Sequence, residues 1–484
     1  MMISQIDIAA IRSVLANMDP KSAVSAARPM SITDLYAPPL HSKALRFNSS
    51  LVVGNRGAGK SVWSGALADK ETRMELASHY DRLGLDKMVV VLGFHEDAGK
   101  VKGVAPSPLT LSSILANGVD PETIWMAVLL KAIATEIEVD VPSNLRETVN
   151  WMLDDPERFE AVLRKADHHF GRRQQKFLLV FDAVDRLANS WDKIRPLSQG
   201  ILRLGLSMLG FENMRAKIFL RTDQEGDEAL FNFPDASKIR AMTVRLAWHS
   251  SELYGLLFST LERDEISKKA FQNIKKFVGN VIDIDINSEE FQRSVFSLIA
   301  GEFMGADHRR GRTYTWLIDH LADAFHETSP RSFLIALQRA ASSHSKPSRT
   351  VIDHHGIREG VQAASAVRVN QLEEDYPWIQ TVLGELEGLE VPCKPDAFIK
   401  RWVNENTVAQ VMRVAKTTGR PGPIGLEGTG SRDRENSLLE ALKNIGVVEE
   451  RSADRINMPD IFRVAAKIKR RGGVRPPSGK VRRK

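Results

Sequence analysis

The stretch "LVVGNRGAGKSVW", residues 51–63, decides the fold of this 484-residue chain. An apolar run ends at a glycine, a short glycine-rich loop follows, and a lysine and a serine open a segment that can continue as a helix. The loop fits the pattern G-x-x-x-x-G-K-[ST] at every specified position. It predicts a strand, a phosphate-binding loop and a helix, with these candidate nucleotide-binding residues: Gly54, Asn55, Arg56, Gly57, Ala58, Gly59, Lys60 and Ser61.

Each residue type in this loop has a chemical reason to be there. Glycines allow positive φ and let backbone N–H groups converge on phosphate oxygens. The positive end of the following helix strengthens the attraction. We expect Lys60 to contact the β- and γ-phosphates as a catalytic cation, and Ser61 to ligate Mg²⁺. The alternative, a glycine-rich turn without a ligand, gives no reason for lysine and serine to fall together.

A second apolar strand supplies an acidic residue for the same site. In "KFLLVFDAVDRL", Asp182 follows a run of apolar residues, where a carboxylate is costly to desolvate without a cation. We expect Asp182 to bind Mg²⁺; the alternative is a cap for the next helix. Asp185 is a catalytic candidate that could orient or deprotonate water, against the alternatives of a turn cap or an ion pair with Arg186. Ala183, directly after Asp182, has no acid–base chemistry.

Apolar strand-like runs alternate with helical segments at 50–54, 88–94, 177–182, 216–222 and 242–248, which predicts a parallel sheet covered by helices. Later segments are helical, and the C-terminal part ends in a helix and two short strand-like runs, the order of a winged helix. We predict an α/β fold with a P-loop NTPase sheet core, a helical lid and a C-terminal winged-helix domain. The predicted parts are an N-terminal helix and linker (1–45), the ATPase core (46–250), the lid (251–345), a linker (346–375), the winged-helix-like domain (376–466) and a basic disordered tail (467–484).

Charge is distributed unevenly along the chain. The net charge is +6, yet ten Lys/Arg and no Asp/Glu fall within 463–484, which leaves 57 basic against 61 acidic residues elsewhere. The tail is therefore either a contact for nucleic acid or a solubilising end. With one cysteine, no signal-peptide pattern and no apolar run of about 18 residues, we expect a cytoplasmic protein without a membrane partner.

These motifs resemble the additional-strand P-loop ATPases, the class that holds the AAA+ and STAND proteins. "FDAVDRL" is similar to the acidic strand end of bacterial KAP- and STAND-type NTPases. The resemblance implies ATP and Mg²⁺ as cofactors. It also implies a γ-phosphate sensor at Arg221, Thr222 and Asp223, and a lid arginine at Arg331 that contacts the γ-phosphate. The class usually has a second acid where this chain has Ala183, which puts fast hydrolysis in doubt.

Two functions remain open at this stage. One is a slowly hydrolysing, Mg²⁺-dependent ATPase that acts as a switch or assembly factor, on nucleic acid through the winged helix and tail, in a bacterial defence or signalling system. Its expected partners include a protein and an ATP-linked homo-oligomer. The other is a nucleotide-locked adaptor that binds ATP and a protein partner without hydrolysis. A small-molecule kinase fits the lid and tail poorly. A GTPase fits poorly as well, because the segment from Asp182 to Asp185 is not the D-x-x-G motif of GTPases and the sequence has no N-K-x-D motif.

Overall fold

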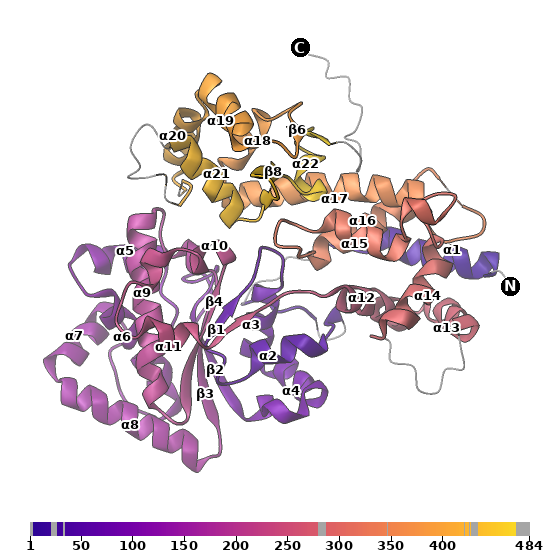
Figure 1. Cartoon of the computed structure of the whole chain (residues 1–484). Coiled ribbons are helices and arrows are strands. Elements are labelled where there is room, and N and C mark those ends of the chain that lie inside the picture. Colours follow the sequence, from indigo (N-terminus) through magenta and orange to yellow (C-terminus); the bar gives the residue numbers. More distant parts are fainter. Residues whose placement is uncertain are drawn as a thin grey trace. The chain divides into compact units, whose positions relative to one another are not determined.

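Five short apolar segments form one parallel sheet in the computed structural model (Figure 1). The strand order is β2-β3-β4-β1-β5, and every neighbouring pair runs parallel. Strand β4 therefore lies between the strand that precedes the glycine-rich loop and the strand that precedes Asp182. The predicted fold class is confirmed. The strands are β1 (Leu51–Val53), β2 (Met88–Phe94), β3 (Lys176–Phe181), β4 (Met214–Leu220) and β5 (Thr243–Arg245).

The structure describes residues 3–20, 27–31, 34–278, 287–345, 347–420, 422–424, 426 and 434–470. The chain divides into two units, and each is described by itself. The sheet unit is Ala23–Ala247, and the helical unit is Met1–Ser22 together with Trp248–Lys484. No helix in the described part of the chain is long and apolar enough to cross a membrane.

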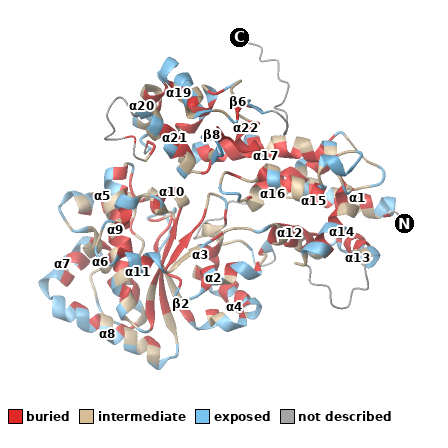
Figure 2. Cartoon of the chain, in the orientation of Figure 1, coloured by how far each residue is buried: buried red, intermediate tan, exposed pale blue. Residues whose placement is uncertain are grey.

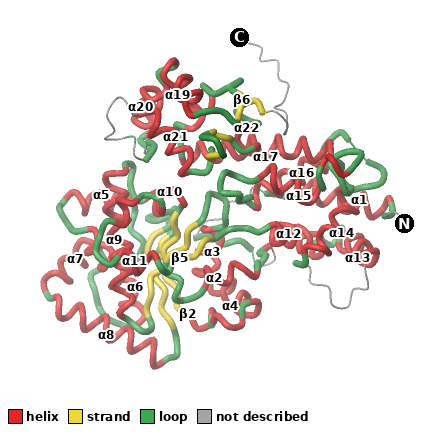
Figure 3. Tube along the Cα trace, in the orientation of Figure 1, coloured by secondary structure: helices red, strands yellow, loops and turns green. Residues whose placement is uncertain are grey.

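Helices cover both faces of the sheet (Figures 1 and 3). The chain crosses from β1 to the far edge at β2 and then returns through β3 and β4. Because such crossovers are right-handed, the outward and return helices lie on opposite faces. The outward helices are α3 (Lys60–Ala68) and α4 (Lys70–His79). The return helices are α5 (Pro108–Ala116), α6 (Pro121–Glu136), α7 (Leu145–Asp154), α8 (Pro156–Arg172), α9 (Trp191–Ser207), α10 (Thr222–Glu225) and α11 (Ala236–Arg240).

For residues 1–45 the sequence predicts a helix followed by a simple linker, and the structure differs from this prediction. Helix α1 (Gln5–Asn17) belongs to the helical unit, where Arg12 donates to the carbonyl oxygens of three residues in 347–351 at 2.7–2.9 Å. Residues 39–45, which include α2 (Ser42–Leu45), belong to the sheet unit. There the buried Lys217 Nζ on β4 donates to the carbonyl oxygens of Ala44 and Arg46. Tertiary hydrogen bonds of this kind leave no periodic signal in the sequence.

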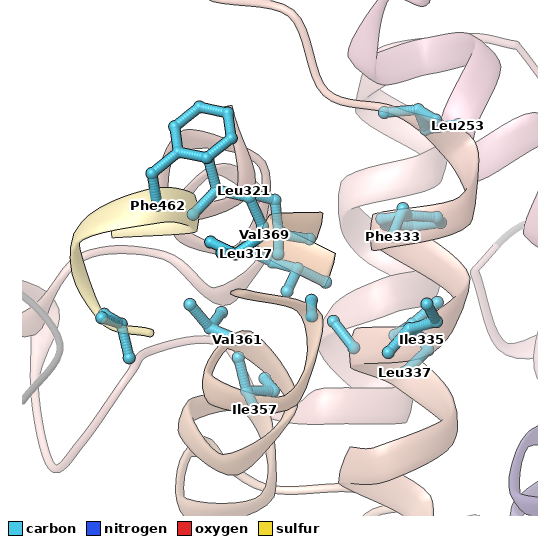
Figure 4. Packing of buried hydrophobic residues seen from close by; sticks show 14 of the residues in the cluster. Leu253, Leu317, Leu321, Phe333, Ile335, Leu337, Ile357, Val361, Val369 and Phe462 are labelled. Atoms are coloured by element: carbon cyan, nitrogen blue, oxygen red, sulfur yellow. The ribbon is translucent and has the colours of Figure 1, made fainter. Parts of the chain in front are cut away.

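The helical unit has one continuous hydrophobic core (Figures 2 and 4). Leu321 and Leu317 on α15 pack with Val369 on α17 and Phe462 on α22, so the lid and the winged-helix part share an interior (Figure 4). The helices before the winged-helix part are α12 (Ser250–Arg263), α13 (Lys268–Val278), α14 (Glu289–Ala300), α15 (Thr313–Leu321), α16 (Pro330–Ala341) and α17 (His354–Asp375).

The predicted linker 346–375 is wrong for most of its length, because α17 fills residues 354–375. A Cβ atom built on Gly360 would lie 2.2 Å from the carbonyl oxygen of Ala336, and one on Gly356 would lie 2.8 Å from that of Ala340. Gly356 and Gly360 thus bring α17 against the backbone of α16. In the sequence these glycines suggest a flexible segment, but in the structure they allow the two helices to pack closely.

The C-terminal part folds as a winged-helix domain. Strands β7 and β8 form an antiparallel hairpin, and β9 pairs in parallel with β6. Residues 469–470 are therefore folded, although the predicted tail begins at 467, and residues 471–484 lie outside the described residues. The elements are α18 (Ile379–Gly384), β6 (Glu390–Val391), α19 (Pro395–Asn404), α20 (Thr407–Thr418), α21 (Arg434–Asn444), β7 (Glu449–Arg451), β8 (Arg455–Asn457), α22 (Asp460–Arg463) and β9 (Lys469–Arg470).

Candidate nucleotide-binding site

The glycine-rich loop joins β1 to α3 with the backbone of a phosphate cradle. Gly57 and Gly59 have φ of 82° and 101°, a region that side chains rarely allow. A Cβ on Gly54 would lie 3.0 Å from the carbonyl oxygen of Leu246, so the loop also passes close to the segment after β5. Helix α3 begins at Lys60, directly after Gly59, which has no side chain to cap it. Its first N–H groups are thus available to an anion.

The side chain of Lys60 contacts the backbone of this loop. Its Nζ donates to the carbonyl oxygens of Gly54, at 2.7 Å, and of Asn55, at 3.0 Å. An ammonium group held at the loop mouth by two neutral carbonyls can exchange them for phosphate oxygens, which bind a cation more strongly. The Lys60 ammonium group thus lies at the glycine-rich loop, and its contact with a phosphate stays a prediction.

Asp182 lies at the end of β3 and is only 3% exposed. Its backbone N–H donates to the carbonyl oxygen of Phe94 on β2. Its carboxylate accepts a hydrogen bond from Ser64 Oγ on α3, at 3.0 Å. Sequence reasoning misses Ser64, which lies one helical turn after Ser61 on the same helix. The contact shows that α3 brings its hydroxyl face toward the acidic strand end.

The oxygen ligands here suit Mg²⁺. A hydroxyl at the start of α3, on Ser61, and the buried Asp182 carboxylate are hard donors, and Mg²⁺ in such sites takes its other ligands from water and phosphate. Within the described ranges, no group of three or more His, Cys, Asp or Glu side chains could hold a metal ion by itself. The residues therefore fit Mg²⁺ that arrives with a nucleotide; Ser61 and Asp182 are the residues that would hold it.

Asp185 is held in an ion pair, but its partner is Arg221 at the end of β4. Arg221 Nη1 lies 3.1 Å from Asp185 Oδ2, and the same guanidinium contacts Asp223 through two nitrogens, at 2.8 and 3.0 Å. Burial raises the pKa of Asp185, yet Arg221, Arg186 and Lys60 together hold that pKa below its usual range. Asp185 is therefore ionised and engaged with a cation.

Backbone strain marks the position between the two aspartates. Ala183 has φ of 54°, in the left-handed region. An L-residue with a Cβ pays about 1–2 kcal/mol to adopt this conformation. It opens the short 3₁₀ turn Val184–Arg186, which carries Asp185. The strain sets the direction in which the chain leaves β3, and hence the position of Asp185.

Thr222 connects the β4 end to the glycine-rich loop. Its Oγ1 donates to Oδ1 of Asn55. Together with the Arg221 pair, this contact brings the predicted sensor segment into the same group as Lys60 and Asp182. The ends of β1, β3 and β4 are adjacent in the sheet, and parallel strands direct their carboxyl ends to one edge.

His95 is a site residue that sequence reasoning misses. It directly follows β2, is 3% exposed, and its buried Nδ1 has no hydrogen-bond partner among the described residues. Burial lowers its pKa, while the nearby charges of Asp97 and Asp182 act in the opposite direction. A signal for it is present in "MVVVLGFHED", where polar residues follow a buried strand next to the Asp182 strand.

A buried hydrogen-bond chain fixes the orientation of α3. Trp63 Nε1 donates to His41 Nδ1 at 3.0 Å, so the proton of a neutral His41 is on Nε2. That nitrogen lies 3.0 Å from the carbonyl oxygen of Ala247 and can donate to it. Both rings are almost fully buried, and their mutual orientation is edge to face. The chain therefore ties the helix that carries Lys60, Ser61 and Ser64 to the segment after β5.

Arg331 lies in the helical unit, at the first turn of α16. Ser329 caps this helix by accepting a hydrogen bond from the Ser332 N–H at 3.1 Å, and Pro330 occupies the first helical position. A serine cap followed by proline is a common start of a helix. The expected contact of Arg331 with a γ-phosphate stays a prediction, because the sheet unit and the helical unit are described separately.

Comparison with solved structures finds distant similarity to a Walker-type ATPase and to Cdc6p and ORC proteins. A Walker-type ATPase of Pyrococcus abyssi is 11% identical, covers 92% of this chain and 98% of its own, and gives a TM-score of 0.40. Cdc6p of Pyrobaculum aerophilum is 14% identical, covers 93% of this chain and 94% of its own, and gives a TM-score of 0.29. The Aeropyrum pernix ORC1 protein in complex with DNA is 12% identical, covers 94% of this chain and 94% of its own, and gives a TM-score of 0.32. No protein-family model and no curated protein matches the sequence. TM-scores below 0.5 carry no functional argument, so the chain's own residues must indicate what it does.

Proposed function

We propose that the chain is a Mg²⁺-dependent ATP-binding switch that hydrolyses ATP slowly. The observation that carries this proposal is the group at the carboxyl edge of the sheet. Lys60, the first residue of α3, contacts the glycine-rich loop, and Ser64 on the same helix contacts the buried Asp182, directly after β3. A buried carboxylate next to a phosphate cradle is explained by a cation that bridges the two. We expect the triphosphate to lie along the loop N–H groups, with Mg²⁺ between Ser61 and Asp182.

The slow rate is expected from the residues around Asp182. ATP with Mg²⁺ supplies the phosphoryl group that a water molecule attacks, and this chain must orient that water and accept its proton. Ala183 cannot do so. Asp185 can accept a proton only to the extent that Arg221 releases it, because an ionised carboxylate paired with a guanidinium is a weak base. A γ-phosphate that attracts Arg221 would free Asp185, so nucleotide binding and base activation are linked in this proposal.

The output of the switch is proposed to be the helical unit. Arg331 would sense the γ-phosphate, and the winged-helix domain and tail would contact nucleic acid or a protein. ATP-linked homo-oligomers and a role in bacterial defence or signalling of the STAND or KAP kind are the finer parts of this proposal. They rest on the resemblance of "FDAVDRL" to those proteins and of the Arg331 helix to the lid of AAA+ proteins.

A second candidate function is the nucleotide-locked adaptor, and Ala183 is the observation that favours it. In that case Asp185 stays paired with Arg221 when ATP is bound, and the nucleotide is bound without being hydrolysed. Both functions share the same binding site, so they differ in turnover and not in affinity.

Steady-state ATP turnover separates the two. We expect measurable wild-type turnover that falls by about a hundredfold in Lys60→Ala and in Asp182→Ala, and by at least about tenfold in Asp185→Ala if it is the base. The exposed Asp81→Ala is the matched control and should keep the wild-type rate. Binding of a fluorescent ATP analogue is measured on the same preparations. Wild-type turnover equal to that of Lys60→Ala, with ATP still bound, would leave the adaptor as the function.

A further inference from the structure

Two faces of the winged-helix domain differ in charge. We call α19, the turn Glu405–Asn406 and α20, with Gly419 and Arg420, the helix corner; α21 with β7 and β8 is the hairpin face. Residues 395–420 hold five Lys/Arg and two Asp/Glu, a balance of +3. Residues 434–457 hold four Lys/Arg and five Asp/Glu, a balance of −1. A polyanion would thus meet attraction at the helix corner and weak repulsion at the hairpin face.

The cations of the helix corner are presented together. Arg413 and Lys416 stand at i and i+3, which places them on one face of α20, and Arg420 follows Gly419, the residue that ends this helix at φ of 61°. All three are exposed. Among the described residues, none of them makes an ion pair with a carboxylate, and Arg413 Nε makes a 3.4 Å contact with the carbonyl oxygen of Ala409 on its own helix. Their charges are available to a partner.

Two cations of the hairpin face, Lys443 and Arg451, are already paired with carboxylates. Lys443 contacts Glu440 at 2.7 Å and also contacts Glu450, and these contacts raise the pKa of Lys443 although its partial burial lowers it. Arg451 contacts Glu449 at 2.6 Å. A phosphate that approached these side chains would have to displace carboxylates first.

The base of the hairpin is also occupied within the helical unit. The carbonyl oxygen of Gly446 accepts a hydrogen bond from the N–H of Ala324, in the segment between α15 and α16, at 2.9 Å. His326 in the same segment lies 3.9 Å from Glu449. The hairpin face therefore packs toward the lid segment, whereas the exposed cations of α20 have no such partner in the described part of the chain.

We propose that α20 is the helix by which this chain binds duplex DNA, and that the hairpin does not act as a DNA-contacting wing. The proposal rests on the proposed function, of which it names the nucleic-acid surface. The two-residue turn, with Asn406 at φ of 51°, joins α19 and α20 as a helix-turn-helix. Helix α20 has 12 residues and is about 18 Å long. The major groove of B-DNA admits such a helix, whereas that of A-form RNA is too narrow.

The partner is duplex DNA rather than a flexible polyanion because the cations have an apolar neighbour on the same corner. Met412 on α20 and Val403 on α19 are exposed, at 39% and 55%. Apolar side chains next to phosphate-binding cations suit a groove wall with thymine methyl groups. We expect Arg413, Lys416 and Arg420 to contact backbone phosphates on either side of the groove, so that they contribute affinity more than sequence choice.

The test compares two variants of the full chain that lose equal charge. One is Arg413→Ala with Lys416→Ala and Arg420→Ala; the matched control is Lys443→Ala with Arg451→Ala and Arg455→Ala. Binding of a fluorescent mixed-sequence duplex of about 30 base pairs is followed between about 50 and 200 mM salt, where each lost phosphate contact lowers the logarithmic salt slope by about 0.9. We expect the α20 variant to lose at least tenfold in affinity and about 2–3 units of slope, and the hairpin variant to stay within about threefold of wild type. Melting temperature and circular dichroism show that both variants are folded.

The outcomes separate this inference from the proposed function. Equal binding by wild type and the α20 variant, or a larger loss in the hairpin variant, overturns the inference alone. The inference is also overturned if DNA binding disappears on removal of 471–484 and is unchanged by the α20 substitutions. Tighter binding of an RNA duplex or of an acidic peptide than of duplex DNA overturns it as well. A wild-type chain that binds no duplex overturns both the inference and the nucleic-acid part of the function. ATP turnover is measured on the same samples, and its absence together with α20-dependent DNA binding would leave the inference standing.

Discussion

The sheet unit and the helical unit achieve their order in different ways. In the sheet unit, polar groups converge on the carboxyl edge of a buried sheet, and Lys60 is held there by hydrogen bonds to backbone carbonyls. In the helical unit, the central contact between α16 and α17 depends on the absence of side chains at Gly356 and Gly360. In the sheet unit, polar groups can therefore exchange a backbone carbonyl for a ligand. In the helical unit, the backbones of α16 and α17 pack directly against each other. The candidate nucleotide-binding residues thus lie in the sheet unit, and the close helix contact lies in the helical unit.

The largest expected effect is on the helical unit alone. Gly360→Ala places a methyl group 2.2 Å from the carbonyl oxygen of Ala336, so α16 and α17 must move apart. We expect a loss of about 3 kcal/mol in the free energy of unfolding of this unit. Hydrogen exchange followed by mass spectrometry should show lost protection in α16 and α17, with β1, β3 and β4 unchanged.

Gly384→Ala is the matched control for this substitution, because a Cβ at Gly384 meets no atom within 4 Å among the described residues. It should leave protection at the wild-type level. Protection lost equally in both units after Gly360→Ala would show that they unfold as one body, and the contrast between them would not hold.

A smaller effect is expected in the sheet unit, as a dependence on pH. Burial lowers the pKa of Lys217 to about 7. Between that pH and the ordinary lysine pKa, the unfolded chain binds a proton that the folded chain releases, so stability rises with pH in this window and is lower at its acidic end. The contribution is at most about 1.4 kcal/mol per pH unit. Urea unfolding of wild type and Lys217→Met at several values from pH 7 to 9 measures the difference in slope.

Lys217→Met also leaves three carbonyl oxygens without their donor, so the variant will be less stable at every pH. The comparison therefore uses slopes and not absolute values. The exposed Lys43→Met on α2 controls for the loss of one positive charge. Parallel curves for wild type and Lys217→Met would mean that Lys217 stays charged in the folded chain and is fully solvated by its carbonyl partners.

The smallest effect distinguishes two hydroxyls on α3. Ser64 positions Asp182 through one hydrogen bond, so Ser64→Ala should weaken Mg²⁺-dependent nucleotide binding by about 1 kcal/mol, or roughly fivefold. Ser61→Ala should weaken it by at least about tenfold, because it removes a proposed ligand of Mg²⁺. Titration of a fluorescent ATP analogue with and without Mg²⁺ measures both. The exposed Ser78→Ala on α4 is the control, and a larger loss in Ser64→Ala than in Ser61→Ala would transfer the ligand role to Ser64.

Much of the sheet unit could be predicted because its signals are local. Central parallel strands are apolar on both faces, and the loop after β1 needs glycines at fixed positions, so a single sequence shows both. Asp182 is recognisable for the same reason, as an acid at the end of an apolar run. The partner of Asp185 could not be found in this way. Arg221 lies 36 residues further along the chain and meets Asp185 only because β4 pairs with β3.

The misses in the helical unit have a different cause. The sequence of residues 354–375 indicates a linker because glycine and polar residues interrupt the apolar pattern, yet the two glycines that weaken a helix by themselves stabilise its contact with α16. Likewise, α1 has a good helical pattern, but nothing in it indicates that Arg12 would bind the carbonyls before α17. Such contacts depend on which elements become neighbours, which periodicity does not specify.

The α16–α17 crossing has a mechanical consequence. Helix α16 begins at Pro330 with Arg331 in its first turn, and α17 leads from the crossing into the winged-helix domain. At Gly356 and Gly360 the two helices are in backbone contact, and no side chain stands at these two positions that could repack and absorb a shift. A displacement of the start of α16 would therefore be transmitted along α16 and α17 as a rigid-body motion of the two helices. The far end of α17 leads into the domain that carries α20.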